Sequence, residues 1–499
     1  MCDEKKRFAV SIKIKPEVYQ KHKLDKDYYK ANRLYNNMVR YVKNKIKDIE
    51  KTKQYKNIIK LLKDKKTTKE KKKQLYKEIN DIISKNKLTS GDLKKYAKQG
   101  NHRAFNKTLR SQSVQVLVQE LYASIEGYFF KGTKIYYRKF GHTNTLSSKS
   151  KNCTILLNKD TSSFRYKEMT FELKEIRPND YYLKEALTNE VVLCKIVRKV
   201  IKNKYAYYLQ IVLKGTPPTK FFKGEGVMGI DQGTSTLAYY KDGLMGFVEL
   251  TPDINKYNKE IIKLQRRMTI KQSLNNPDCY NEDGTIKKGS KFYRSKSYLK
   301  DLFRLKDLYR RKTVYVQQEH NKLVKFILSN CDTIVKETLD FKALQKRVKS
   351  KAVRQDKQAK AVDAKGNIKY IYKYKRKKRF GKSLNNHSPG YLDAQLLKKA
   401  NEAGIDVIKV DMRKYRASQY NHHTDEYIKP SLGDRFKVID NNKVQRDLYS
   451  SFLLCNYKNE ETINRDKCIN SFENFLKLQE ELLKTVKDTT GNFGLKHFV

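Results

Sequence analysis

The sequence lacks long hydrophobic runs and paired cysteines. No stretch approaches the ~18 uninterrupted apolar residues of a membrane-spanning helix, and the N-terminal "MCDEKKRFAV" lacks the apolar core of a secretory signal. We therefore expect neither membrane insertion nor secretion. The seven cysteines are odd in number, scattered and without CxxC spacing. This pattern argues against a disulfide scaffold or a zinc ribbon and suits a reducing cytoplasm.

Acidic residues are scarce relative to basic ones. The 499 residues include 54 Asp and Glu against 110 Lys and Arg, a formal net charge of +56 at pH 7. No globular fold needs such an excess, because self-repulsion costs stability. The charge is spread along the whole chain, which favours a long nucleic acid over a membrane surface as the partner. The 35 Tyr and 21 Phe include rings that can stack on unpaired bases, although most are expected in the core.

The first half of the chain reads as a β-domain interrupted by helices. Period-two alternation of apolar residues over 7–16, ended by Pro16, predicts a half-buried strand. Helical spacing follows over 33–49 and 111–131, with a lysine-rich helical insertion at 51–88 between them. Residues 160–215 return to period two and predict antiparallel strands that pair with the first one.

After residue 225 the pattern becomes α/β. The strands are predicted at 226–231, 237–241, 246–250, 332–338 and 406–411, with helices between them and after the last. One helix is framed by Ser388 as N-cap, Pro389 in the first turn and Gly404 as the stop. The strongly basic stretch 351–380 is expected to be a loop that orders only on a nucleic acid.

Three carboxylates stand out by position. Asp231 ends the first α/β strand, Glu337 ends the strand at 332–338, and Asp447 opens a helix after the last strand. A ribonuclease-H-like sheet would bring them together, where they could hold two Mg²⁺ for in-line phosphodiester hydrolysis. Gly233 would let a phosphate backbone approach Asp231. Each acid alone is typical of a turn, so only the trio in this basic chain carries the prediction.

The stretch "IDQGT" has a competing interpretation. It resembles the turn that handles ATP phosphates in sugar kinases and Hsp70-type ATPases. Those families place the turn at the N-terminus and add a second glycine-rich phosphate loop. Here it begins after residue 225, the chain has only 21 Gly, and no second loop follows. A nucleotide kinase site is therefore rejected.

The chain from about 226 to 460 resembles the RuvC nuclease domain of the TnpB proteins and of the compact type V CRISPR effectors. The resemblance is carried by "MGIDQGTSTLAYY", "TIVKETLDFKALQKR" and "VQRDLYSSFLL", and by the basic helical connector from "LQRRM" onward. The first half agrees more loosely, through "ANRLYNNMV", "LRSQSVQVLVQELYASIEGYFFKG" and "KIYYRKFGHTN".

The resemblance implies an RNA-guided, Mg²⁺-dependent DNA endonuclease in which Asp231, Glu337 and Asp447 are the catalytic metal ligands for two Mg²⁺. It implies a guide RNA of the omega-RNA or crRNA type, target double-stranded DNA, and a short target-adjacent motif read in the duplex. We expect a monomeric ribonucleoprotein in a prokaryotic cytoplasm, associated with the nucleoid. Two alternatives stay open: a guide-independent transposase or resolvase of the same sheet, and a nuclease-dead RNA-guided repressor.

The same resemblance predicts an α+β multidomain fold: a β-barrel-like wedge domain with an inserted helical recognition lobe, followed by a ribonuclease-H-like (RuvC) α/β nuclease domain. The expected domains are wedge strands at 1–30, the helical lobe at 31–135, the rest of the wedge at 136–220 and the nuclease at 221–499. Within the nuclease domain we expect a helical connector at 251–330, a basic loop at 350–385 and a lid at 413–440.

The lid departs from the family pattern. Many TnpB proteins carry cysteine pairs there, whereas this chain has Tyr420 and His423, so no structural zinc is expected. A rebuilt site using His422, His423 and Cys455 is disfavoured, because adjacent histidines rarely share one ion. The predicted nucleic-acid contacts are Arg266, Arg267, Lys291 and Arg294 in the connector and Arg416, Gln419 and Arg435 in the lid; solvated surface residues are the alternative reading of all seven.

Overall fold

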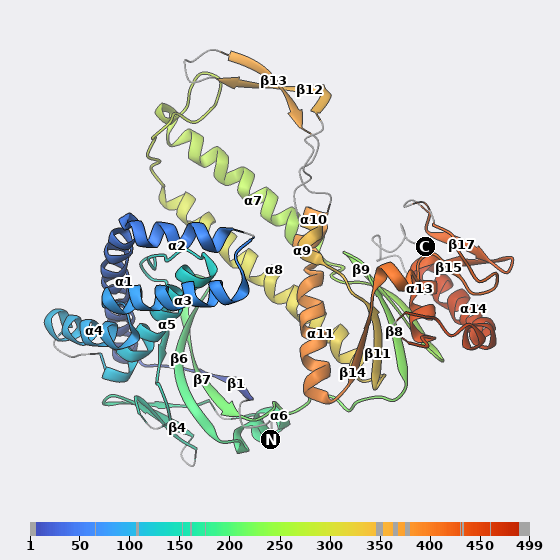
Figure 1. The fold of residues 1–499 in the computed structure, drawn as a ribbon, viewed down its shortest axis with the longest axis horizontal. Helices are drawn as coiled ribbons and strands as arrows, with labels where there is room; N and C mark the ends of the chain where they lie inside the picture. Colours follow the sequence, from blue (N-terminus) through green and yellow to red (C-terminus); the bar gives the residue numbers. More distant parts are fainter. Residues whose placement is uncertain are drawn as a thin grey trace. The chain divides into compact units, whose positions relative to one another are not determined.

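The chain divides into two compact units, unit 1 at Met1–Pro218 and unit 2 at Thr219–Val499 (Figure 1). The computed structural model describes residues 6–64, 66–105, 109–151, 153–159, 162–174, 176–345, 353–362, 368–374, 380–429, 431, 434–459 and 461–488. Among the helices of these ranges, none combines the length and the apolar character needed to cross a lipid bilayer.

Unit 1 contains two antiparallel sheets. The larger has the order β1-β7-β6-β2, from β1 (Arg7–Ile14), β7 (Lys204–Lys214), β6 (Val191–Ile201) and β2 (Thr145–Ser147). The smaller consists of β3 (Ile155–Asn158), β4 (Ser163–Tyr166) and β5 (Met169–Glu172). The alternation predicted for the first strand is confirmed, since Val10, Ile12 and Ile14 are buried, and β1 pairs with β7 as expected.

The expected barrel-like closure is wrong for the described strands. β1 forms one edge of the larger sheet and the three-residue β2 forms the other, so the sheet stays open. The smaller sheet joins the larger through a single antiparallel bridge between Ile14 and Leu173. Closure requires a continuous ladder between the edge strands. Pro16, which lacks a backbone N–H, ends β1 two residues beyond that bridge.

The helices of unit 1 follow the apolar stripes of the sequence. They are α1 (Val18–Lys51), α2 (Lys53–Lys63), α3 (Lys69–Lys85), α4 (Ser90–Phe105), α5 (Ser111–Lys131) and α6 (Tyr181–Thr188). The stripes predicted for α1 and α5 are buried, and Gly132 ends α5 in the left-handed conformation with φ +65°. The lysine-rich insertion at 51–88 is helical, anchored by Ile58 of α2 and Ile79 of α3.

Unit 2 is built on a mixed five-stranded sheet. Its order is β10-β9-β8-β11-β14, from β10 (Leu244–Glu249), β9 (Thr236–Lys241), β8 (Val227–Gln232), β11 (Thr333–Glu337) and β14 (Asp406–Val410). β9 is antiparallel to both β8 and β10, whereas β8, β11 and β14 run parallel to one another. All five strands were predicted to within two residues at each end.

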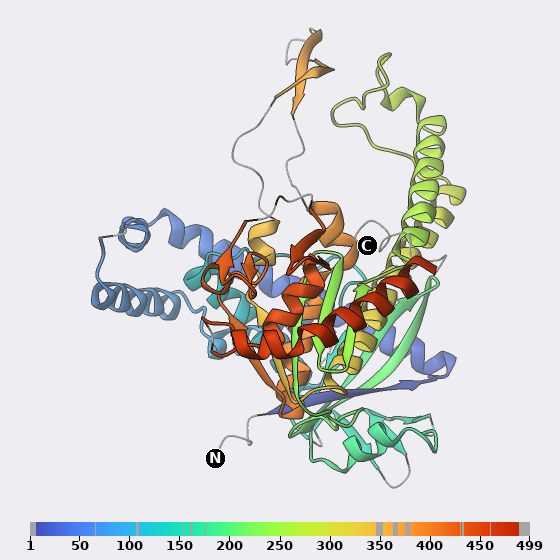
Figure 2. The same ribbon diagram turned by 90° about the vertical axis from the view of Figure 1, so that its right-hand side faces the viewer.

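Helices cover both faces of this sheet. On one face α11 (Pro389–Ala403) and the end of α8 (Lys296–Leu328) pack against Met228, Ile230 and Ile334. On the other, α13 (Arg446–Cys455) and α14 (Arg465–Asp488) pack against Ala238, Tyr240 and other residues of the sheet. Figure 1 shows the sheet between α11 and α13, and in Figure 2 α14 lies in front of the strands. The result is a three-layer α/β/α arrangement.

The remaining elements of unit 2 are shorter or lie outside the sheet. They are α7 (Ile254–Leu274), the 3-10 helix η2 (Pro277–Cys279), α9 (Phe341–Leu344), α10 (Gly381–His387), α12 (Met412–Tyr415), β15 (Tyr420–Asn421), β16 (Glu426–Tyr427), β17 (Phe436–Ile439) and β18 (Asn442–Gln445). Ser388 occupies the N-cap position of α11 as predicted. It has φ +45° and makes no side-chain cap bond, because it also ends α10.

The basic stretch 350–385 is not the loop expected from its charge. Its described residues form an antiparallel hairpin of β12 (Val353–Val362) and β13 (Ile368–Tyr374), and α10 begins at Gly381. Residues 350–352, 363–367 and 375–379 of the predicted loop lie outside the described residues. The alternation of Ile368, Tyr370 and Tyr372 is a strand signal that the surrounding lysines obscured.

Candidate active site

The sheet of unit 2 brings two of the predicted carboxylates to one edge. Asp231 is the penultimate residue of β8, and Glu337 is the last residue of β11. The parallel register pairs Ile230 with Lys336. The next residues along, Asp231 and Glu337, therefore lie side by side at the carboxyl ends of neighbouring strands. Open α/β sheets present their sites at this edge.

The third carboxylate arrives on α13, which lies directly against β8. A Cβ added at Gly229 would stand 2.0 Å from the carbonyl oxygen of Ser451 and 2.3 Å from the backbone nitrogen of Cys455. Only glycine permits so close an approach. Since Gly229 and Asp231 face the same side of β8, the helix that covers Gly229 also brings Asp447, in its first turn, toward Asp231.

The three carboxylates influence one another electrostatically. Burial raises the pKa of Asp231 well above its ordinary range, and the charges of Asp447 and Glu337 raise it further. Arg446 and a hydrogen bond from Ser450 act in the opposite direction. Burial also raises the pKa of Glu337 to about 7. Raised pKa values for two acids beside a third carboxylate are typical of a site where negative charges crowd together.

Two basic residues that the sequence analysis missed stand at this site. Nε of Arg446 lies 3.3 Å from Oδ1 of Asp447, and its Nη1 donates to the carbonyl of Asp434 at 2.9 Å. On β17, burial and the nearby Arg446 lower the pKa of Lys437 to about 8. Arg446 could have been suspected because it precedes Asp447 in "VQRDLY". No pattern in the sequence pointed to Lys437, which reaches the site only through the β17–β18 hairpin.

The three carboxylates suit a divalent cation in donor type, since Mg²⁺ prefers hard oxygen ligands. Their negative charges crowd together and raise the pKa of Asp231, and a divalent cation would balance these charges. Within the described ranges, however, no group of three or more His, Cys, Asp or Glu side chains is arranged to hold a metal ion. One oxygen of Asp447 is engaged by Arg446. The three carboxylates therefore have the charge and the oxygen donors that suit Mg²⁺, but they are not arranged around a common ion position.

Beneath the carboxylates, on the other face of the sheet, lies a buried polar clamp formed by Gln232, Lys336 and Asp393. Lys336 is 2% exposed; its Nζ donates to Oε1 of Gln232 at 3.1 Å and forms an ion pair with Asp393 of α11. Nε2 of Gln232 in turn donates to the carbonyl of Pro389 at 2.9 Å. At the end of β8, Asp231 faces one side of the sheet and Gln232 the other. At the end of β11, Glu337 and Lys336 are divided between the two sides in the same way. The clamp ties the ends of β8 and β11 to the first turn of α11.

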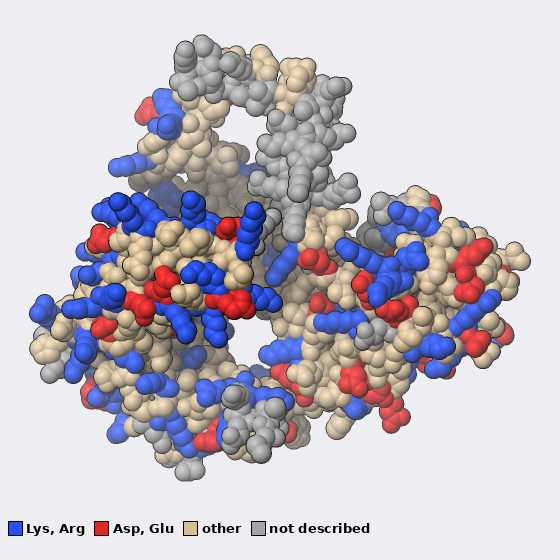
Figure 3. Space-filling model, in the orientation of Figure 1, with Lys and Arg blue, Asp and Glu red and all other residues tan. Residues whose placement is uncertain are grey.

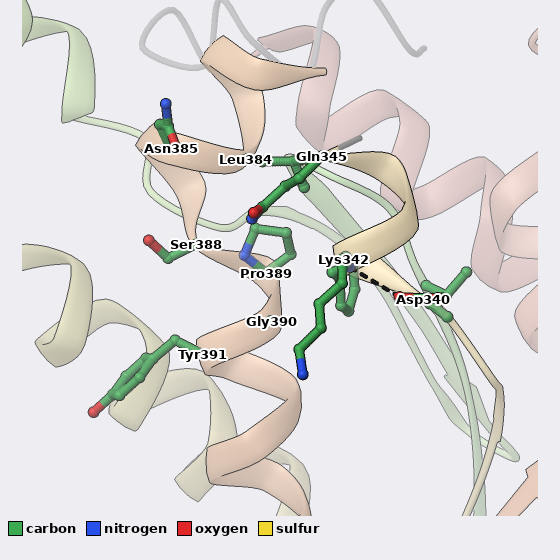
Figure 4. Close-up of a pocket in the computed structure, with 11 residues that line it drawn as sticks. Asp340, Lys342, Gln345, Leu384, Asn385, Ser388, Pro389, Gly390 and Tyr391 are labelled. Carbon is green, nitrogen blue, oxygen red and sulfur yellow. Dashed lines mark hydrogen bonds between the residues drawn. The ribbon is translucent and has the colours of Figure 1, made fainter. Parts of the chain in front are cut away.

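A cavity of about 670 Å³ opens beyond the end of β11 (Figure 4). Its walls include α9 and the junction of α10 with α11, and its polar lining includes Lys342, Gln345, Asn385 and Ser388. Asp340 accepts a hydrogen bond from the backbone nitrogen of Lys342 at 2.9 Å, and the Lys342 side chain extends beside the first turn of α11. Donors of these kinds contact phosphate and sugar groups in nucleic-acid complexes.

The predicted contacts in the helical connector fall into two classes. Arg267 makes two hydrogen bonds to Asp301, which also accepts from Lys271, so this arginine holds α7 against α8. Arg266, Lys291 and Arg294 are exposed. Arg294 lies with its guanidinium 6.0 Å from the ring centroid of Tyr298. The structure thus gives Arg267 an internal partner and leaves the other three on the surface.

Two of the predicted lid contacts, Arg416 and Gln419, lie in a small turn before β15, and the third, Arg435, lies just before β17. Arg416 is exposed, with its guanidinium 4.4 Å from the ring centroid of Tyr427. Gln419 is half-buried, and its backbone nitrogen donates to the carbonyl of Arg416 at 2.8 Å. Arg435 is half-buried, and its carbonyl accepts from the backbone nitrogen of Arg446, which places it near the carboxylates.

The histidines of this region face different ways. His422 is 2% exposed, with Nδ1 2.7 Å from the hydroxyl of Tyr449, and burial lowers its pKa to about 4. His423 lies at the surface, with Nε2 3.4 Å from Asp440. Sγ of Cys455 donates to the carbonyl of Val227. The rebuilt site of His422, His423 and Cys455 that we considered from the sequence does not form in this structure.

No protein-family model matches the chain, and no curated protein matches it. Among solved structures, a Cas12f1–sgRNA–target DNA complex matches 91% of this chain and 99% of its own, at 12% identity and a TM-score of 0.41. A CRISPR-Cas12f ternary complex matches 91% and 100% of the two chains, at 13% identity and a TM-score of 0.28.

A third solved structure, of the mini-RNA-guided endonuclease CRISPR-Cas_phi3, matches 93% of this chain and 92% of its own, at 10% identity and a TM-score of 0.28. The chain is therefore similar in structure to compact RNA-guided effectors over most of its length.

Proposed function

We propose that this protein is an RNA-guided DNA endonuclease whose reaction centre is formed by Asp231, Glu337 and Asp447. The observation that carries the proposal is the convergence of these acids at one edge of the sheet, where burial and the neighbouring charges raise the pKa of Asp231. The mixed five-stranded sheet of order β10-β9-β8-β11-β14 supports the ribonuclease-H-like fold that the sequence resemblance implies. The net charge of +56 supports a polyanionic substrate.

Mg²⁺ ions held by the three carboxylates would activate a water and stabilise the charge that develops on the phosphodiester. The chain's own residues prepare the site for this chemistry. Ser450 hydrogen-bonds to Asp231, and Arg446 holds one oxygen of Asp447. Arg446 places positive charge beside Asp447, where it would face an approaching phosphate group, and Lys437 lies near Arg446. The Gln232–Lys336–Asp393 clamp fixes the spacing of the two strand ends from the opposite face.

The proposed partners are a locus-encoded guide RNA and target double-stranded DNA, as the sequence resemblance implies. The same kinds of molecule, an sgRNA and target DNA, are bound in the Cas12f1 complex named above. In such a system base pairing reads the sequence, while the protein grips the backbones and reads a short motif beside the target. We propose that the cavity beside Lys342 receives a segment of the strand that approaches Glu337.

The first test is the RNA that copurifies with the protein when it is expressed from its native locus. A discrete structured RNA ending in a variable segment is expected, and the protein loaded with it should cut DNA that matches the segment in Mg²⁺. DNA cutting by RNA-free protein would instead indicate a guide-independent transposase or resolvase.

A second candidate is an RNA-guided DNA-binding protein that does not cut. The ion pair between Arg446 and Asp447 favours it, because it leaves the carboxylates short of a closed ligand set. In that case the RNA-loaded protein would bind matching DNA with the same affinity in Mg²⁺ and in chelator, and the DNA would stay intact. Cleavage of the matching DNA would reject this candidate.

A further inference from the structure

Unit 1 contains a cavity of about 480 Å³ that the proposed reaction centre does not use. Its lining includes Arg33, Asn37 and Arg40 of α1, Gly100 and Ala104 of α4, and Tyr137 of the segment after α5. This volume lies within the range of ~300–1,000 Å³ that is usual for small-ligand sites. The cavity is large enough for one nucleotide.

Two arginines give the cavity a positive rim. Arg33 and Arg40 are seven residues apart on α1, so they lie on the same side of the helix two turns apart. Both are exposed, and neither forms an ion pair with any described residue. Arg33 contacts Tyr29, with Nη1 3.4 Å from its hydroxyl and the guanidinium 5.6 Å from its ring centroid. Guanidinium groups without acidic partners are suited to phosphate.

The aromatic wall is held in place although it is exposed. Nδ2 of Asn36 donates to the carbonyl of Arg138, and the backbone nitrogen of Arg138 donates to Oδ1 of Asn36, both at 2.8 Å. This pair fixes the backbone next to Tyr137, whose side chain stays 48% exposed. Nζ of Lys43 lies 4.7 Å from the Tyr137 ring centroid. A fixed, exposed ring beside positive charge is a stacking surface for a nucleobase.

The third wall offers hydrogen-bonding groups and little bulk. The side-chain amide of Asn37 lines the cavity and makes no hydrogen bond to a described residue, so its donors and acceptor are available to a base edge. Across the cavity α4 presents Gly100 and Ala104. A Cβ at Gly100 would stand 3.3 Å from Cδ1 of Leu34 and 4.0 Å from Nδ2 of Asn37. A larger side chain there would crowd the Asn37 amide.

We propose that this cavity binds one unpaired nucleotide of a nucleic-acid strand, with the base on Tyr137 and the flanking phosphates on Arg33 and Arg40. The inference shares with the proposed function the premise that the protein binds nucleic acid, and it is independent of the carboxylates. An acidic peptide would use the arginines but not the combination of an exposed ring and a free amide. The strand can be RNA or DNA, because the chemistry of base and phosphate is shared.

The test is photo-crosslinking of the full chain, in chelator, to short single-stranded RNA and DNA oligonucleotides that carry 5-iodouracil. Mass spectrometry should locate the crosslink at Tyr137, and comparing the two oligonucleotides shows which strand is preferred. Tyr137→Ala should weaken binding about tenfold, the usual scale for loss of one stacked base. Tyr181→Ala, which removes a 74% exposed tyrosine of α6, is the matched control and should leave affinity unchanged.

An oligonucleotide with abasic sites should bind wild type and Tyr137→Ala equally. The double variant Arg33→Ala/Arg40→Ala should reduce the salt dependence of binding by about 1.4 in the slope of log affinity against log salt. The exposed pair Arg165→Ala/Arg177→Ala serves as its control. The inference is overturned if crosslinks avoid Tyr137, or if a glutamate-rich peptide displaces the oligonucleotide as well as unlabelled RNA does. Asp231→Ala should retain the crosslink, so a failed nuclease proposal would leave this result unchanged.

Discussion

At the scale of single residues, the proposed reaction centre combines crowded negative charge with close packing of α13 on β8. Asp231 and Glu337 are half-buried with their pKa values raised, and Arg446 and Ser450 lower the pKa of Asp231. Gly229 allows α13 to approach β8 closely enough to bring Asp447 into the group. Charge and packing can therefore be tested separately, one through Glu337 and the other through Gly229.

Glu337 predicts a pH dependence of stability in chelator. Its pKa is raised from the ordinary 4.5 to about 7, so its stabilising contribution is present below pH ~4.5 and is lost as the pH rises through about 7. A shift of this size corresponds to about 3 kcal/mol. We expect the free energy of unfolding in urea to fall by about 3 kcal/mol more for wild type than for Glu337→Gln as the pH is raised from about 4.5 to above 7. Parallel curves for the two proteins would contradict the assignment.

Gly229→Ala should destabilise the protein strongly, by about 3 kcal/mol or more, because its methyl group would overlap the Ser451 carbonyl. Gly390→Ala is the control: its Cβ would meet only Phe341, at 3.6 Å or more. Helix propensity makes that change neutral or slightly stabilising, by up to about 1 kcal/mol. Thermal unfolding compares the two variants, and equal melting temperatures would mean that α13 does not lie on Gly229.

The individual acids could be predicted from sequence, and their surroundings could not. Asp231 directly follows an apolar run and Glu337 ends the strand pattern "TIVKE", so the strand ends that carry them could be predicted. Lys437 returns to the site through the β17–β18 hairpin, and the Lys336–Asp393 pair joins a strand to a helix 57 residues later. Nothing in the sequence marks Gly229 as the point where α13 approaches β8. Contacts between distant segments leave no periodic signal in a single sequence.

At the scale of elements, the carboxylate edge depends on how β8 and β11 are joined to α11. The clamp formed by Gln232, Lys336 and Asp393 is the polar part of that junction, whereas Leu392 and Leu396 of α11 supply its apolar part. Burial lowers the pKa of Lys336 and Asp393 raises it, so the lysine depends on its partner to keep its charge. Removing one partner should therefore cost more than removing both.

Lys336→Met should cost about 2 kcal/mol, a value reduced from that of a fully buried pair because the Asp393 side chain is 27% exposed. Adding Asp393→Leu should restore most of the loss. Lys398→Met breaks only an exposed pair with Glu402 and should change stability by less than about 0.5 kcal/mol. A double-mutant cycle measured by urea unfolding tests this. Additive losses would show that Lys336 and Asp393 are not coupled.

Adjacent arginines of α7 provide a second comparison at this scale. Arg267 is bound to Asp301, whereas Arg266 is exposed and makes no hydrogen bond or ion pair with a described residue. Arg267→Ala should lower the melting temperature. Arg266→Ala should leave it unchanged and reduce the salt slope of DNA binding by about 0.9 if it contacts one phosphate. The reverse pattern would show that Arg267 is the nucleic-acid contact and that Arg266 is structural.

Elements were predicted well wherever apolar periodicity was clean, and poorly where charge masked it. The five strands of the unit 2 sheet and the stripes of α1 and α5 were readable for that reason. The hairpin of β12 and β13 was missed because lysines surround Ile368, Tyr370 and Tyr372. The barrel was wrong for a different reason: strand periodicity predicts that strands form, but not whether the edge strands of a sheet meet.

At the scale of the whole molecule, the excess of positive charge is distributed over both units. On the face shown in Figure 3, Lys and Arg lie over α1, α2 and α3 of unit 1 and also over unit 2. The proposed reaction centre gathers three carboxylates within this strongly basic chain. A polyanion would be attracted to most of the surface and repelled by the uncompensated acids. Divalent cations would remove that repulsion.

The most direct measurement of the central claim is cleavage and binding of matching DNA by the RNA-loaded protein, for wild type and Asp231→Ala. We predict that wild type cuts in Mg²⁺, and that Asp231→Ala abolishes cutting while changing the affinities for guide RNA and target DNA less than about threefold, or under 0.7 kcal/mol. Cutting at the wild-type rate by Asp231→Ala, or a loss of binding that parallels the loss of cutting, would contradict the claim.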